Sequence, residues 1–412
     1  MGDSTHDENR ISEPTGSKSL AAVLFVQTQN AFNDNFVKFV LIGLAMVVAA
    51  GTAVGDDIEF ILTAMIPIPF ILLAPVAGYL SDRFSKKLVL WWCVVGQFLI
   101  FAFIAVCVWK RNVHLAVFGF FLLAVQSTIF SPAKQGILKE LVGTARLSFA
   151  NGLMSMLTMV GILGGMILAG VWYDTLLAGY NAEFGESIEN NWKAALITIL
   201  GIGAGSVIAM IICLFVRNTP SHPSEKFTPT VLVRHFVHLR DLFKKRVLKL
   251  TALYITWYWF VANFLGLGFV AFAKSMFSDL TRQGLLTATG KMMSAVGIGL
   301  IAGSLLVSFL SKNRIRLPLS PIGGIGMAIG FCGAGLLTAG SPAWYSALGV
   351  IGFASAFYVV PLNAHLQDRA DESSRGRVIS ALNLMTSFSG VLAIGIGKGL
   401  KELGLSPGHQ LL

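Results

Sequence analysis

The chain has 412 residues, of which 55% are hydrophobic and only 13% are charged, and its net charge is +10. A soluble globular domain has about 25% charged residues, so this composition excludes an ordinary soluble protein and indicates helices that cross a membrane. The positive charge does not indicate a nucleic-acid partner, because the basic residues lie between apolar segments, where membrane topology accounts for them.

Apolar segments long enough to cross a bilayer recur along the chain, so the sequence predicts an all-α membrane protein. A polar tail over residues 1–18 lacks a signal-peptide core and is expected to be disordered in the cytoplasm. An N-terminal six-helix bundle (19–216), a basic cytoplasmic linker (217–249) and a C-terminal bundle with five helices (250–412) are expected to follow it. The predicted spans lie near residues 20–50, 59–80, 88–109, 114–138, 148–172, 193–216, 250–274, 285–310, 317–339, 344–367 and 378–402.

Lys and Arg residues gather in the loops on one side of these spans. In bacterial membrane proteins that side is the cytoplasmic one, which places the N-terminus in the cytoplasm. The loops on the other side contain acidic stretches, GDDIE (55–59) and EFGESIEN (183–190). We therefore expect a multi-pass membrane protein with a cytoplasmic N-terminus.

The first span carries polar residues in its middle, in the stretch QNAFNDNFVK (29–38). At helical spacing, one face carries Gln27, Asn30, Asp34 and Lys38. Isolated charges in the hydrocarbon are costly, so such residues normally face a cavity and pair with each other. We expect a substrate cavity here, with Asp34 and Lys38 spaced to pair. The alternative is that Lys38 reaches the outer interface and the asparagines only bridge helices.

The fourth span adds Gln126 and Lys134 to this cavity. Pro132 interrupts its helical hydrogen bonds, and aligning Pro132 with Pro361 of the tenth span places Lys134 opposite Asn363. This match predicts two related halves with the substrate site between them. Two interpretations of Lys134 remain open: it points into the cavity toward an anionic group such as a phosphate, or it reaches the cytoplasmic headgroups.

The number of spans is odd, although two equal halves require an even number. The sequence stops at LKELGLSPGHQLL (400–412), directly after the eleventh span. We therefore expect this chain to lack a twelfth helix.

A short loop after the second span, GYLSDRFSKKL (78–88), resembles the signature loop of the major facilitator superfamily. Gly78 allows two helices to approach closely. Asp82 is expected to face the amino end of the eleventh span, whose free N–H groups favour an anion. Arg83 is expected to pair with Glu140 at the end of the fourth span. These four residues would form a conformational latch; the alternative is a basic loop that serves only topology.

Five stretches together resemble the bacterial lysophospholipid transporter family of this superfamily, or the transporter portion of its acyltransferase-fused relatives. These stretches are AFNDNFVKF (31–39), GYLSDRFSKK (78–87), FSPAKQGILKEL (130–141), ANGLM (150–154) and VVPLNAHLQDR (359–369). The resemblance implies a major facilitator fold of two six-helix bundles. It also implies a location in the bacterial inner (cytoplasmic) membrane and movement of lysophospholipids from its outer to its inner leaflet, with the acidic residue of the first span at Asp34. A basic residue that some members carry in the seventh span has no counterpart near residues 263–268.

A lysophospholipid needs an apolar wall for its single acyl chain and polar groups for its head. We expect the head to be bound by Asn30, Asp34, Lys38 and Lys134, and the chain by the phenylalanine face of the first span: Phe25, Phe32, Phe36 and Phe39. The sequence contains no metal-ligand spacing, nucleophile elbow or nucleotide loop, so we expect a transporter without a cofactor and not an enzyme.

Two other functions remain open. One is a proton-coupled exporter of drugs or small metabolites that uses Asp34. The other is a membrane module that delivers substrate to an attached acyltransferase. In each case the partners are membrane lipids and an amphiphilic or small-molecule substrate.

Overall fold

The computed structural model describes residues 14–56, 58–221, 235–276 and 282–403, and all regular structure within these ranges is helical. The first half contains α1 (Pro14–Val48), α2 (Ala53–Asp56), α3 (Ile58–Met65), α4 (Pro67–Arg83), α5 (Lys86–Trp109), α6 (Val113–Phe184) and α7 (Ile188–Cys213). The second half contains α8 (His235–Lys244), α9 (Arg246–Met276), α10 (Arg282–Leu310), α11 (Leu319–Leu336), α12 (Pro342–Arg369), the short η2 (Glu372–Ser374) and α13 (Arg375–Glu402).

Helix α6 has 72 residues and contains both the fourth and the fifth predicted span. Gly143 interrupts it with φ 67° and ψ 178°, a conformation that only glycine adopts readily. We call residues 113–142 the first arm of α6 and residues 144–184 its second arm. The second predicted span is likewise divided into α3 and α4, because Pro67 begins a new helix.

Nine helices within the described ranges are long and apolar enough to cross a membrane. The two arms of α6 are counted once among them, and α9 adds a further helix of 31 residues. The eleven predicted spans are therefore confirmed as helices. Residues 404–412 lie outside the described part of the chain, so the expectation that this chain lacks a twelfth helix stays a prediction.

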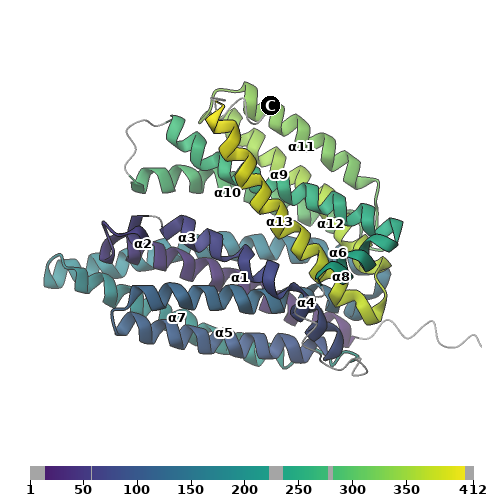
Figure 1. Cartoon of the computed structure of the whole chain (residues 1–412), viewed down its shortest axis with the longest axis horizontal. Coiled ribbons are helices and arrows are strands. Elements are labelled where there is room, and N and C mark those ends of the chain that lie inside the picture. Colours follow the sequence, from purple (N-terminus) through teal and green to yellow (C-terminus); the bar gives the residue numbers. More distant parts are fainter. Residues whose placement is uncertain (1–13, 57, 222–234, 277–281, 404–412) are drawn as a thin grey trace, which may run out of the picture.

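Figure 1 shows two bundles, with α1, α5 and α7 (purple to teal) in one and α9 to α13 (green to yellow) in the other. Helix α1 packs mainly on α6, and α12 packs mainly on α10 and α11. Gly161 and Gly165 of α6 lie directly against the backbone of α1, where a β-carbon would collide with the carbonyls of Thr28 and Phe32. The bundles meet along α4, α6, α10, α12 and α13.

Two predicted segments differ from the structure. Helix α1 begins at Pro14, so residues 14–18 of the predicted tail are helical; proline is well suited to the first turn of a helix. The predicted linker contains α8, which packs on α13 because Leu242 is fully buried there. Residues 1–13 and 222–234, which include the remainder of the tail and part of the linker, lie outside the described residues.

Candidate functional site

The carboxylate of Asp34 is held by uncharged donors from three helices. Ser127 of α6 donates to Oδ2 at 2.7 Å, Asn30 of α1 donates to the same oxygen at 3.1 Å, and Gln97 of α5 donates to Oδ1 at 3.4 Å. Within the part of the chain that the structure describes, no Lys or Arg forms an ion pair with Asp34. The cluster therefore fixes the carboxylate in the middle of the span without cancelling its charge.

Asn30 connects the cluster to the fourth span. Its side-chain oxygen accepts from Gln97 at 3.1 Å and from Gln126 at 3.2 Å, and Gln126 also donates to the carbonyl of Cys93 at 3.1 Å. The structure thus brings together three predicted cavity residues: Asn30, Asp34 and Gln126. The sequence analysis did not predict Gln97 as a member of this cluster. Its position as the single glutamine in the apolar third span could have indicated a buried polar contact.

The other two members of the predicted stripe lie away from this cluster. Gln27 is buried and donates to Thr158 of the second arm of α6 at 2.9 Å. Lys38 donates to Thr63 of α3 at 3.0 Å. The predicted pair between Asp34 and Lys38 is therefore wrong: helical spacing permits it, but three neutral donors surround Asp34 and the lysine side chain turns toward α3.

Lys134 and Asn363 are half-buried and lie on different bundles. The ammonium of Lys134 is 5.3 Å from the centroid of the Phe130 ring, and within the described residues it forms no ion pair with Asp34. In the described ranges, neither the Lys134 ammonium nor the Asn363 amide has a hydrogen-bond partner in the protein. Their part in a substrate site stays a prediction.

The signature loop joins the two bundles. Asp82 accepts from the backbone N–H groups of Gly376 at 2.6 Å and Arg377 at 3.0 Å, at the amino end of α13. The Arg377 guanidinium adds an ion pair at 3.2 Å. Gly78 lies so close to α13 that a β-carbon would meet the Cα of Arg377 and the Cβ of Ser380 at 3.0 Å. The contact that the sequence predicts for Asp82 is present.

The predicted pair between Arg83 and Glu140 is wrong. Glu140 binds Lys86 at 2.5 Å and Arg375 at 3.5 Å, and all three side chains are more than nine-tenths buried. Arg83, at the carboxyl end of α4, instead donates to the hydroxyl of Tyr79. The reason is positional: Lys86 begins α5 and packs against the first arm of α6 at Gly136, directly beside Glu140.

A second set of polar contacts between the bundles was not predicted. Asn151 and Gln367 exchange two amide hydrogen bonds of 2.9 Å, and both side chains are buried. Lys139 forms an ion pair with Asp368 at 2.9 Å, and Thr144 donates to the same carboxylate at 2.6 Å. All polar contacts that join the bundles within the described residues lie toward the end where α4 meets α13 and the arms of α6 meet α12.

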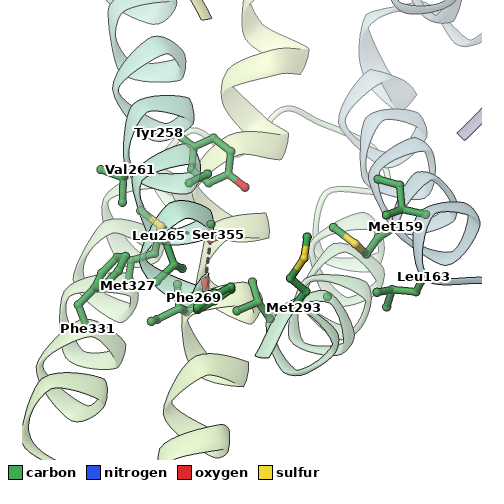
Figure 2. Close-up of a pocket in the computed structure, with 16 residues that line it drawn as sticks. Met159, Leu163, Tyr258, Val261, Leu265, Phe269, Met293, Met327, Phe331 and Ser355 are labelled. Carbon is green, nitrogen blue, oxygen red and sulfur yellow. Dashed lines mark hydrogen bonds between the residues drawn. The ribbon is translucent and has the colours of Figure 1, made fainter. Parts of the chain in front are cut away.

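A cavity of about 190 Å³ lies between α6 and the second bundle. Figure 2 shows Met159 and Leu163 of α6 on one side and Met293, Met327 and Phe331 of the second bundle around it. The predicted apolar wall on the first span is a different surface. Phe36 is fully buried in the core of the first bundle, and Phe32 and Phe39 pack against that core, so these rings stabilise the bundle.

The model of the Major Facilitator Superfamily matches residues 23–394. The chain is 29% identical over 391 residues to the lysophospholipid transporter LplT of Serratia proteamaculans (strain 568). This alignment covers 93% of this chain and 88% of that protein. It is also 29% identical over 407 residues to the lysophospholipid transporter LplT of Pectobacterium carotovorum subsp. carotovorum (strain PC1), with 95% and 89% covered.

Two solved structures share the fold. The human organic anion transporter MFSD10 superimposes with a TM-score of 0.71 at 14% identity, over 97% of this chain and 96% of that chain. The Escherichia coli fucose:proton symporter FucP superimposes with a TM-score of 0.68 at 16% identity, over 96% and 94%. At these identities the two structures support the fold alone.

Proposed function

The chain belongs to the Major Facilitator Superfamily and is a multi-pass membrane transporter, and from this premise we propose that it moves lysophospholipids between the leaflets of a bacterial inner membrane. The direction would be from the outer to the inner leaflet, by alternating access. Membership of a transporter family also means that the protein is not an enzyme. The names of the relatives, which are 29% identical over nearly the whole chain, support this substrate class.

The observation that carries the proposal is a pair of opposite charges in the membrane-spanning part that do not pair directly. Asp34 is held by neutral donors that include Ser127 of α6, and Lys134 lies seven residues after Ser127 on the same face of that helix, without an ion pair to Asp34. Charged side chains in a span are costly and typically mark a substrate pathway. A zwitterionic headgroup that carries a phosphate and an ammonium would complement both charges: the phosphate would bind Lys134 and the ammonium would bind Asp34.

The contacts between the bundles support alternating access. Asp82, Glu140 and Asp368 each join one bundle to the other at the end that carries the basic loops. That end is the cytoplasmic one by the distribution of Lys and Arg. We interpret the structure as a state closed toward the cytoplasm, from which these contacts must separate before a lipid can leave on that side.

Uptake of labelled lysophosphatidylethanolamine by cells without their own lysolipid transporter tests this function. We expect label to reach the inner leaflet with the wild-type protein and not with Asp34→Asn. Asp241→Asn is the matched control, because it makes the same chemical change on the exposed surface of α8. Wild-type protein that is present in the membrane but moves no lysolipid would refute the proposal.

The uncompensated carboxylate also fits a second function, a proton-coupled exporter of small amphiphiles. Intramembrane carboxylates commonly serve as proton carriers. A protonophore, which collapses the proton gradient, distinguishes the two functions. Lysolipid movement that continues after this treatment excludes proton-coupled export. Export of a small amphiphile that stops under the same treatment supports proton-coupled export.

A further inference from the structure

The walls of the cavity carry no charged side chain, and the only hydroxyls among the lining residues are those of Tyr258 and Ser355. Three flexible methionines, Met159, Met293 and Met327, line it together with branched and aromatic side chains. Ser355 has a hydroxyl in the wall, and this hydroxyl already donates to the carbonyl of Ile351 at 2.8 Å. Apolar pockets bind apolar groups, and methionine adapts to irregular shapes. The chemistry of the wall therefore suits a hydrocarbon chain.

The cavity crosses the boundary between the bundles. Met159 and Leu163 belong to the second arm of α6, whereas Gly297, on the opposite wall, belongs to α10 (Figure 2 shows the two α6 side chains facing the second bundle). A β-carbon at Gly297 would lie 2.8 Å from Leu163 and 3.2 Å from Met159. The two helices thus approach closely only because Gly297 has no side chain, and the cavity changes shape whenever the bundles move.

The part of α6 that lines the cavity also contacts the first span. Thr158 accepts the hydrogen bond from Gln27, and the next residue, Met159, lines the cavity. Gly161 packs against the carbonyl of Thr28 on α1, and Ile162 lines the cavity. One turn of α6 therefore carries contacts to the polar stripe on one side and a wall of the apolar cavity on the other. This arrangement suits a ligand with a polar head and an apolar tail.

We propose that this cavity binds the single acyl chain of the transported lipid while the headgroup is held in the first bundle. The inference rests on the proposed function and deepens it, because it assigns the tail of the lipid to residues of α6, α9, α10, α11 and α12. The phenylalanine face of the first span then has no part in binding the chain.

Two glycines allow the cavity to be filled without damage to the fold. Gly266 lines the cavity, and a β-carbon there would meet no atom within 4 Å. Gly266→Leu therefore adds a side chain into open space. Gly290 of α10 also has no atom within 4 Å of a β-carbon but does not line the cavity. Gly290→Leu is thus the matched control, with the same added atoms outside the cavity.

The experiment uses the full chain in membranes and a lysophosphatidylethanolamine with a diazirine at the end of its acyl chain. After irradiation, mass spectrometry locates the labelled residues. We expect label on Met159, Met293 and Met327, a loss of about tenfold with Gly266→Leu, and no change with Gly290→Leu. Label elsewhere, or label that Gly266→Leu leaves unchanged, would overturn the proposal.

Bilayer phospholipids carry the same hydrocarbon chemistry, so a competition arm distinguishes the source. Unlabelled lysolipid should displace the probe, whereas the same concentration of diacyl phosphatidylethanolamine should not; equal displacement by both would assign the cavity to bulk lipid and overturn the proposal. Failure of the transport proposal looks different. If the acyl tail labels the cavity as expected but the wild-type protein takes up no lysolipid, transport is refuted and the acyl-chain site is retained. If Gly266→Leu leaves uptake unchanged, the acyl-chain site is refuted and transport is retained.

Discussion

Lys139 and Asp368 occupy equivalent positions in the two halves of the chain and form an ion pair with each other at 2.9 Å. When Pro132 is aligned with Pro361, each residue lies the same distance after its proline. Equivalent positions of two related halves can touch only near the axis that relates them. Two residues of like charge at these positions would repel each other, whereas Lys139 and Asp368 carry opposite charges and attract. The pair therefore joins the halves at the centre of their closed end.

The ion pair at the axis should stabilise the closed state. Lys139→Asp and Asp368→Lys should each open this end, and the double variant should restore it, with a coupling of about 1 kcal/mol. The measurement uses the variant Ser131→Cys, because the native Ser131 hydroxyl accepts a hydrogen bond from Asn383 across the interface between the bundles. The quantity measured is the rate at which a membrane-impermeant thiol reagent, applied from the cytoplasmic side, labels this cysteine. Cys332→Ser removes the exposed native thiol. Additive effects in the double variant would contradict a direct pair.

Asp82 should contribute more to the closed state than an exposed ion pair of the same region. Asp82→Ala removes the acceptor of two backbone N–H groups of α13, and hydrogen bonds to a charged group contribute about 2 kcal/mol each. We expect slower transport with unchanged substrate affinity. Asp371→Ala is the control, because its pair with Lys245 is half exposed and should contribute less than about 1 kcal/mol. Equal effects on transport rate would count against the latch.

Glu140 should be more important for stability than Arg83. Glu140→Gln leaves the ammonium of Lys86, which is 1% exposed, without its counter-ion, and an unpaired buried charge destabilises a protein by about 3 kcal/mol or more. Arg83→Ala removes a contact with the Tyr79 ring and hydroxyl and should cost about 1 kcal/mol. Thermal unfolding in detergent compares the two. A larger loss with Arg83→Ala would mean that Lys86 is not the partner of Glu140.

The two lysines near the polar stripe should differ in function. Lys134→Met should abolish lysolipid movement, because it removes the cation that lies near Asp34. Lys38→Met should leave most of the movement, because Lys38 binds Thr63 of α3 instead. Uptake at matched protein levels tests this, with Asp34→Asn as the inactive reference. If Lys38→Met abolishes uptake and Lys134→Met does not, the result would support the pair between Asp34 and Lys38 that the sequence predicts.

The sequence by itself determined the number and type of spans, because apolar length is a property of local sequence. It also placed Asn30 and Asp34 on one face of the first span, because helical spacing is local. Asn30 and Asp34 are four residues apart on α1 and hydrogen bond to each other at 3.1 Å. The contact of Asp82 with α13 could be expected for a similar reason, since a helix amino end favours an anion whatever its surroundings.

Only the tertiary structure decided which of several similar partners a charged group takes. Glu140 could in principle pair with Arg83, Lys86 or Arg375, and the choice depends on how α4, α5 and α13 pack around the first arm of α6. The same holds for the apolar surfaces. Phe36 of the first span and the methionines of the cavity are equally hydrophobic in sequence, but Phe36 is fully buried in the core of the first bundle, whereas Met159, Met293 and Met327 line a cavity. Packing in three dimensions, which residue spacing does not encode, makes that difference.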